Sequence, residues 1–368
     1  MKIIPVYSRK FDSLEIKYLK NVIKSSWVSS GGYYSSKLIS SFSNFIKQDY
    51  VSLVSSGTAA LETAFAGINL KKNDEVIIPN FTIVSCLNAV LKFGAKPIFV
   101  DVDRNTWLMN MQDVKKSITS KTKAILAVNI FGNPVNITDL KKIINNRKIY
   151  IIEDCAESLG SKINNKICGS ESDISIFSFY TNKLITSGEG GAVCTSNKKF
   201  YKRIEDYKNL FFGKKERFNH KDIGYNYRLT NLQAAIAYSS MMKINQNIDT
   251  LKKNGELYLH LFNKNKNIVF QQNNNNSLKV WWMYPVIFKN KNLNINKIRN
   301  KLLKKSIDTR NLFKSLDTMS FLKKYKYKSS GNKNSNYLYK NGLYLPSGLD
   351  LTKKQINYIC EEVNKLIG

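Results

Sequence analysis

The chain has 368 residues, enough to bury a large core in one to three domains. Its hydrophobic share of 43% and charged share of 23% are ordinary for a soluble globular protein. No apolar run approaches the roughly 20 residues that span a bilayer, and the N-terminus lacks the apolar core of a signal peptide. Five cysteines without a CxxC pair argue against a disulfide framework or a zinc cluster, so we expect a cytoplasmic protein.

The formal net charge of +31 is unusual and has two interpretations. One is a polyanionic partner, and the other is a chain-wide bias towards Lys, Asn and Ile. Basic residues are dispersed apart from short runs such as 323–326, which favours the bias and predicts no nucleic-acid partner. The two histidines, His220 and His260, are too few for a multi-histidine metal site or a histidine triad. Any chemistry is therefore expected to use a cofactor and no metal.

Apolar strand-like runs alternate with helical patterns between residues 50 and 200. Helical spacing occurs at 60–68 and 84–91. Fully apolar strands alternating with helices predict an α/β fold with a mostly parallel sheet covered on both faces. The predicted strands are 51–54, 76–78, 97–100, 124–130, 149–152, 174–179 and 192–194.

The remaining third of the chain has a different pattern. Thr230 is a good N-cap for a long helical segment that runs towards Phe262. An Asn-rich loop, a strand and further helices follow, at 271–276, 280–288, 295–303 and 352–367. We predict a large domain of residues 1–245 and a smaller α/β domain of residues 246–368.

Three motifs in the predicted large domain can carry chemistry. Ser55-Ser56-Gly57-Thr58 ends a strand and opens a helix, where free N–H groups favour a phosphate, although an ordinary N-cap has the same pattern. Asp154 ends the strand 149–152 and suits a protonated pyridine nitrogen, although an acid capping the next turn is the alternative.

The third motif is Lys183, between the strand 174–179 and the Gly-rich turn 186–191. Most lysines are solvated surface charges, but this position suits an amine that binds an aldehyde cofactor and moves a proton. The Ser178 hydroxyl is a further candidate phosphate donor. A phosphate turn, an acid and a lysine 29 residues later (183 − 154) is the order found in fold-type I pyridoxal-phosphate enzymes.

The chain resembles the DegT-type sugar aminotransferases from end to end, and within that family the perosamine synthases. The matching stretches are Trp27-Val28-Ser29-Ser30-Gly31, Ser56-Gly57-Thr58-Ala59-Ala60-Leu61, Asp74-Glu75-Val76-Ile77-Ile78-Pro79, Gly94-Ala95-Lys96-Pro97, Glu153-Asp154-Cys155-Ala156-Glu157, Phe177-Ser178-Phe179, Lys183 with residues 185–191, and Tyr225-Asn226-Tyr227-Arg228-Leu229-Thr230-Asn231.

The resemblance implies a role for each site residue. Lys183 would bind the aldehyde of pyridoxal 5'-phosphate, and Asp154 its pyridine nitrogen. Glu157 would lie near the ring hydroxyl. The phosphate would be held by a group of small residues, namely Gly57, Thr58 and Ser178.

The family pattern also implies a homodimer with shared active sites. Asn226 would reach the phosphate bound by the neighbouring subunit. Arg228 is a candidate for the substrate's anion, with a surface role equally open. Ile83 stands where relatives often stack an aromatic ring on the cofactor.

The implied reaction moves an amino group from L-glutamate to C4 of a nucleotide-linked 4-keto-6-deoxy hexose, for surface glycans such as O-antigen. Related dehydratases carry His where this chain has Lys183, which favours transamination. The turn at 308–310 lacks the Pro and the following Pro-x-His usual in perosamine synthases, so C3 amination or a dTDP- or UDP-linked sugar stays open. A non-catalytic, polyanion-binding member of the fold is the remaining alternative.

Overall fold

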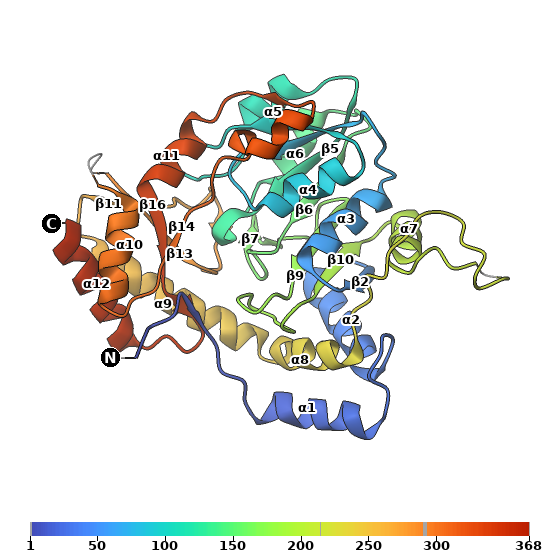
Figure 1. The fold of residues 1–368 in the computed structure, drawn as a ribbon, viewed down its shortest axis with the longest axis horizontal. Helices are drawn as coiled ribbons and strands as arrows, with labels where there is room; N and C mark the ends of the chain where they lie inside the picture. Colours follow the sequence, from blue (N-terminus) through green and yellow to red (C-terminus); the bar gives the residue numbers. More distant parts are fainter. Residues whose placement is uncertain (1, 214, 290–292, 368) are drawn as a thin grey trace.

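A computed structural model describes residues 2–213, 215–289 and 293–367. Within these ranges eight strands form one large sheet, with helices on both of its faces (Figure 1). Neighbouring strands run parallel except β10, which is antiparallel to both β9 and β2. The order across the sheet is β15 (Lys328–Ser329), β4 (Lys96–Val100), β3 (Glu75–Pro79), β5 (Thr122–Val128), β6 (Tyr150–Asp154), β9 (Ile174–Ser178), β10 (Gly191–Thr195) and β2 (Tyr50–Val54).

Alternating side chains of this sheet enter two separate cores. In β10, Val193 faces one core while Ala192 and Cys194 face the other, as the two-residue period of a strand requires. The first core includes α3 (Gly57–Gly67) and α4 (Val84–Lys92), and the second includes α2 (Tyr33–Ile46) and α8 (Asn231–Met242). The predicted α/β architecture with a mostly parallel sheet is confirmed.

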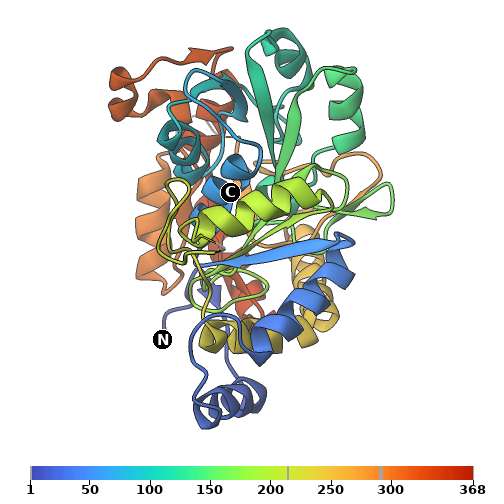
Figure 2. The same cartoon turned by 90° about the vertical axis from the view of Figure 1, so that its right-hand side faces the viewer.

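Further helices surround the sheet. Figure 2 shows α7 (Lys198–Lys208) crossing the molecule beside β2, while α1 (Ser13–Lys24) lies at the periphery in both views. The others are α5 (Met111–Ser117) and α6 (Ile137–Ile144), with short 3-10 turns at Ile130–Gly132, Leu316–Thr318 and Ser320–Lys324. A small sheet joins β12 (Ser277–Leu278), β7 (Lys162–Ile163) and β8 (Lys166–Ile167).

The C-terminal part has its own antiparallel sheet and core. Tyr258, Tyr284 and Val363 are among the side chains that fill this core. The sheet order is β11 (Ile268–Phe270), β13 (Tyr284–Phe288), β16 (Gly342–Leu345) and β14 (Arg310–Asn311), packed with α9 (Ile244–Phe262), α10 (Ile295–Lys304), α11 (Lys333–Asn341) and α12 (Lys353–Ile367). The first residue of α9 lies next to the expected boundary at residue 245, which stays a prediction.

The N-terminal segment lies against this C-terminal part. β1 (Tyr7–Ser8) pairs in parallel with β17 (Ser347–Gly348), and Ile4 bridges to Ile307. Ile4, Tyr7 and Ser8 of the predicted large domain therefore contact the C-terminal part of the chain.

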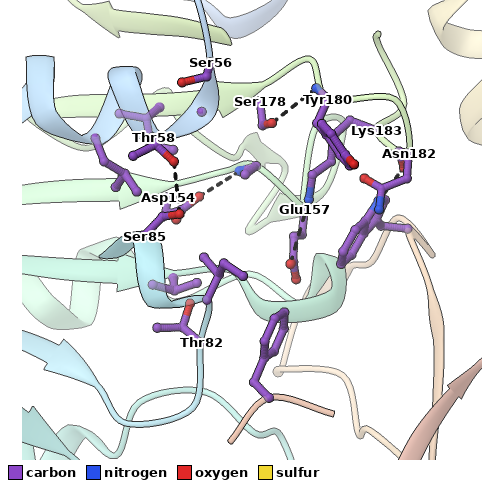
Figure 3. Close-up of a pocket in the computed structure, with 18 of the residues that line it drawn as sticks. Ser56, Thr58, Thr82, Ser85, Asp154, Glu157, Ser178, Tyr180, Asn182 and Lys183 are labelled. Atoms are coloured by element: carbon purple, nitrogen blue, oxygen red, sulfur yellow. Dashed lines mark hydrogen bonds and ion pairs between the residues drawn. The ribbon is translucent and has the colours of Figure 1, made fainter. Parts of the chain in front are cut away.

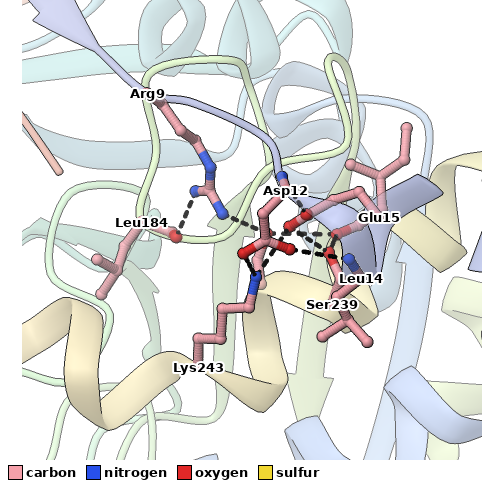
Figure 4. A network of polar contacts seen from close by, with 9 residues as sticks. Arg9, Asp12, Leu14, Glu15, Leu184, Ser239 and Lys243 are labelled. Atoms are coloured by element: carbon pink, nitrogen blue, oxygen red, sulfur yellow. Dashed lines mark hydrogen bonds and ion pairs between the residues drawn. The ribbon is translucent and has the colours of Figure 1, made fainter. Parts of the chain in front are cut away.

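The predicted long helix from Thr230 to Phe262 is divided into α8 and α9 at Lys243. Thr230 is the N-cap, because its side chain accepts a hydrogen bond from Gln233 N. Lys243 has φ −106° and ψ 12°, so the helical backbone is interrupted there. Its ammonium pairs with Asp12 and lies 3.6 Å from Glu15, which joins α1 to this junction (Figure 4).

Arg9 connects the same network to the loop that carries Lys183. Its guanidinium donates to Leu184 O at 2.9 Å (Figure 4). It also donates to Ser240 Oγ at 2.6 Å. Leu184 directly follows Lys183, so this hydrogen bond holds the loop next to Lys183.

In the described part of the chain, no helix is long and apolar enough to cross a bilayer.

Candidate active site

A cavity of about 390 Å³ opens where β6 and β9 end and α3 begins (Figure 3). Carboxyl ends of parallel strands meet at one edge of a sheet, which explains why motifs far apart in the chain converge there. Seven of the predicted site residues line this cavity, namely Gly57, Thr58, Ile83, Asp154, Glu157, Ser178 and Lys183.

The N-terminus of α3 forms one end of the cavity. Ser56 is its N-cap and accepts a hydrogen bond from Ala59 N at 3.0 Å, so the N-cap interpretation of this motif is correct, while the phosphate site stays a prediction. A Cβ at Gly57 would lie 2.9 Å from Ser178 Cβ, so glycine is what allows the helix to approach β9 this closely. Thr58 Oγ1 donates to Ser85 Oγ at 3.0 Å. Hydroxyls and free N–H groups at a helix N-terminus are groups that can donate to a phosphate.

Asp154 is a buried carboxyl on the floor of the cavity. Its Oδ1 accepts from Ala156 N at 3.0 Å, which is the turn-capping contact, and its Oδ2 accepts from Cys86 Sγ at 3.4 Å. Burial raises the pKa of Asp154, while the hydrogen bond from Ala156 and the charge of Lys183 lower it. A buried carboxylate of this kind gains from a cationic partner in the cavity.

Lys183 and Glu157 face each other across the cavity. Lys183 Nζ lies 3.9 Å from Glu157 Oε1. Burial lowers the pKa of Lys183, and the charges of Glu157 and Asp154 oppose that shift. Burial also raises the pKa of Glu157 to about 7, against the charge of Lys183 and a hydrogen bond from Phe131 N. A lysine with a lowered pKa holds more neutral amine, the form that attacks an aldehyde.

Aromatic side chains form the wall that the sequence did not predict. Trp282 lies with its ring centre 3.6 Å from Lys183 Nζ, and its Nε1 donates to Asn182 O at 2.7 Å. Phe313 and Tyr344 line the same wall. The available signal for Trp282 was the tandem tryptophan in a segment predicted to start a strand at residue 280; β13 begins later, at Tyr284.

Ile83 is the N-cap residue of α4 and is 43% exposed at the cavity. Its side chain is aliphatic, at the position where relatives often have an aromatic ring.

Asn226 and Arg228 lie elsewhere in this chain. Arg228 donates from Nε to Asn226 Oδ1 at 2.8 Å and from Nη1 to Asn209 Oδ1 at 3.0 Å. Arg228 lines a second cavity of about 600 Å³ beside α7, together with Lys208. A single chain therefore does not bring either residue to Lys183, and the roles expected for them stay predictions. Across the described ranges, no cluster of three or more His, Cys, Asp or Glu residues is arranged to hold a metal ion.

Curated relatives match the chain over nearly its whole length. The chain is 35% identical over 365 residues to the GDP-perosamine synthase of Escherichia coli O157:H7, covering 99% of both chains. It is 32% identical over 357 residues to the GDP-perosamine synthase of Vibrio cholerae, covering 97% of both.

A solved structure shows the same fold. The Escherichia coli GDP-4-keto-6-deoxy-D-mannose-3-dehydratase with bound hydrated pyridoxal phosphate superposes with a TM-score of 0.92 at 27% identity, over 98% of this chain and 100% of that one. The sequence pattern of the DegT/DnrJ/EryC1/StrS aminotransferase family matches residues 9–364. The chain therefore belongs to the DegT/DnrJ/EryC1/StrS aminotransferase family, which depends on pyridoxal phosphate.

Proposed function

We propose that this aminotransferase moves an amino group from L-glutamate to C4 of a GDP-linked 4-keto-6-deoxy hexose. The observation that carries the proposal is Lys183, a buried amine between the carboxylates of Asp154 and Glu157 in the cavity. The names of the two GDP-perosamine synthase relatives support the choice of sugar nucleotide.

The residues of the cavity fit pyridoxal phosphate. The α3 N-terminus with Gly57, Thr58 and Ser178 would hold the phosphate, because backbone N–H groups and hydroxyls donate to phosphate oxygens. Asp154, whose burial favours a cationic partner, would contact the pyridine nitrogen. Ile83 would give the ring an aliphatic contact.

When bound, the cofactor supplies an aldehyde that accepts the amino group and a ring that acts as an electron sink. Lys183 removes the proton from Cα of the glutamate and delivers a proton to C4 of the sugar, a task suited to an amine with a lowered pKa. Asp154 keeps a proton at the ring nitrogen by supplying a fixed negative charge beside it. Trp282 covers Nζ and limits access of water to it.

A homodimer with shared sites would complete this arrangement. Asn226 and Arg228 lie on a loop away from the cavity of their own chain, which supports delivery to the cavity of a neighbouring subunit. The enzyme would work in the cytoplasm, and its product would feed surface glycan synthesis such as that of O-antigen.

Complementation between two inactive variants tests the shared site. Lys183→Ala chains retain Asn226, and Asn226→Ala chains retain Lys183, so a mixed dimer has one intact site. Random exchange makes roughly half of the dimers mixed, so we expect roughly a quarter of wild-type activity. Activity is measured after subunit exchange has been verified with differently tagged chains. No recovery in verified mixed dimers would contradict the shared site.

The turn at 308–317 bears on substrate choice. Phe313 from this segment lines the cavity, and Asp317 N donates to Asn80 Oδ1 at 2.9 Å, so the altered turn is fixed beside the active site. A hydrogen bond lost in a buried pocket costs about 1–3 kcal/mol, which is enough to redirect the choice of sugar.

We expect the GDP-linked 4-keto-6-deoxy hexose to be aminated with the highest kcat/KM among GDP, dTDP and UDP sugars. All three are assayed at one ionic strength, because the net charge of +31 raises the association rate of every anionic substrate at low salt. A dTDP or UDP sugar preferred by more than about tenfold, roughly 1.4 kcal/mol, would contradict the GDP assignment. Identification of the aminated carbon by NMR separates C4 from C3 products.

A further inference from the structure

Lys279 is a buried lysine outside the lining of the catalytic cavity. The residue is 4% exposed, and it lies between β12 and β13. Its Nζ donates to Gln271 Oε1 at 2.6 Å and lies 4.2 Å from the centre of the Trp281 ring. No carboxylate of the described residues pairs with it within 4.0 Å. A buried ammonium without a directly paired carboxylate is costly, so its surroundings call for a functional explanation.

Gln271 links Lys279 to a strained turn. Its Nε2 donates to Ile130 O at 3.2 Å and to Thr106 O at 2.8 Å. Ile130 opens the turn Ile130–Gly132, in which Phe131 has the left-handed φ of 52°. A left-handed conformation at a large aromatic residue is unfavourable and persists only when its surroundings hold it.

The segment next to Lys279 holds the other side of this turn. Gly132 has φ +85°, and a Cβ there would lie 1.9 Å from Val280 O, so the two backbones are in close contact. Ser161 Oγ donates to Gly132 O at 2.7 Å and accepts from Val280 N at 3.0 Å. Gln271 and Val280, at the two ends of the loop 271–280, therefore both contact the turn Ile130–Gly132 and hold it in place.

The turn Ile130–Gly132 positions Glu157. The left-handed backbone of Phe131 directs its N–H to Glu157 Oε2 at 2.7 Å, while Oε1 of the same carboxylate lies 3.9 Å from Lys183 Nζ. Buried contacts thus run from Lys279 through Gln271 and the turn to the carboxylate that faces Lys183.

We propose that Lys279 is a positioning residue of the transamination site, whose ammonium and its Gln271 contact fix the orientation and charge of Glu157. The proposal rests on the function proposed above, because it assigns Lys279 to the same site. Its consequence is that the catalytic lysine is controlled by a second lysine that does not touch the reacting atoms.

The electrostatics have a definite sign. Burial raises the pKa of Glu157 to about 7, and the charge of Lys279 opposes this shift less than the charge of Lys183 does. Burial lowers the pKa of Lys279 to about 7, and the charge of Glu157 opposes this shift. Removing the positive charge of Lys279 must therefore raise the pKa of Glu157 further. The other titratable groups that interact with Glu157 are Lys183, Asp154, Tyr344 and Cys86.

The first test follows the Glu157 carboxyl directly. Cofactor-free full-length protein carries carbon-13 in its glutamate side-chain carboxyls, and Glu157→Gln assigns the signal. In Lys279→Met the titration midpoint of Glu157 is expected to rise, and by less than in Lys183→Ala, because Lys183 has the larger effect on the pKa of Glu157. The matched control is Lys162→Met, an exposed lysine paired with Leu278 in the small sheet, which leaves the midpoint unchanged. An unchanged midpoint in Lys279→Met would overturn the proposal.

The second test separates positioning from structure in the cofactor-saturated enzyme. Lys279→Met is expected to lower kcat about tenfold with both KM values within about twofold, because the binding groups stay in place. The Tm is expected to fall modestly together with kcat, because the variant leaves the buried Gln271 Oε1 without its donor. A lower Tm with normal kcat per folded enzyme would show a structural role and overturn the proposal.

Gln271→Met keeps the test decisive if Lys279→Met does not fold. It removes the link to the turn and leaves Lys279 without its acceptor but keeps the lysine, so the same fall in kcat is expected with a smaller rise in the Glu157 midpoint. Normal values of both would contradict the proposal. If Glu157 responds to Lys279 but the wild-type enzyme aminates none of the keto sugars, the proposed function fails and the coupling stands.

Discussion

Lys183→Ala is expected to lower kcat by at least about 10²–10⁴-fold, because the general acid-base group is removed together with the covalent anchor. Borohydride reduction followed by peptide mass spectrometry should find the cofactor on the peptide containing Lys183 in the wild type and on no peptide of the variant.

The control for this variant is Lys198→Ala, an exposed lysine that opens α7. It should keep wild-type kcat and wild-type cofactor labelling. A Lys183→Ala enzyme with near-normal turnover, or a borohydride label found on another lysine, would contradict the assignment of the catalytic lysine.

Asp154→Asn is expected to lower kcat by about 10²–10³-fold, the usual effect of removing one preorganised electrostatic partner. Asparagine keeps the size of the side chain and can still accept from Ala156 N, as Asp154 does at 3.0 Å. The expected loss is therefore specific to the negative charge that we propose lies beside the pyridine nitrogen. Steady-state kinetics at saturating cofactor measure it, and cofactor affinity should weaken as well.

Glu153→Gln is the matched control for Asp154, because Glu153 is the preceding buried carboxyl on β6. Its Oε1 accepts from Asn129 Nδ2 at 2.8 Å, away from the cavity lining. Per folded enzyme, kcat should stay within about threefold of wild type. Equal losses in both variants would mean that general disruption of β6, and no specific charge, explains the effect.

The hydrophobic pattern was sufficient for seven of the eight described strands of the large sheet, because these seven are largely buried, whereas β15 is exposed and was not predicted. The predicted strand 124–130 shows the limit, since β5 ends at Val128 and Ile130 already belongs to the 3-10 turn with left-handed Phe131. The pattern assigned no element to residues 13–46, where α1 and α2 lie. The predicted helix across Lys243 could not be divided from sequence, because its interruption accompanies contacts to Asp12 and Glu15 far away in the chain.

The candidate site was predictable to the extent that local motifs end parallel strands. Gly57, Asp154 and Lys183 follow three different strands, and the sheet topology alone brings them together. Trp282 comes from the C-terminal part of the chain, where no local rule says which side chain faces the cavity. The contact between Lys279 and Gln271 was not predictable either, because it depends on how the loop between them folds back.

The pairing of β1 with β17 affects how the protein folds during synthesis. The N-terminal segment leaves the ribosome long before its partner strand is synthesised, so Tyr7 cannot pair with Ser347 until translation is nearly complete. Contacts between residues so far apart in the chain slow folding and leave intermediates with exposed apolar surface. Until then Ile4 has no bridge to Ile307, and Arg9 lacks Ser240 for most of translation. A ribosome-bound chain stopped before residue 340 should therefore be cleaved by protease in its first ten residues, while the released chain resists.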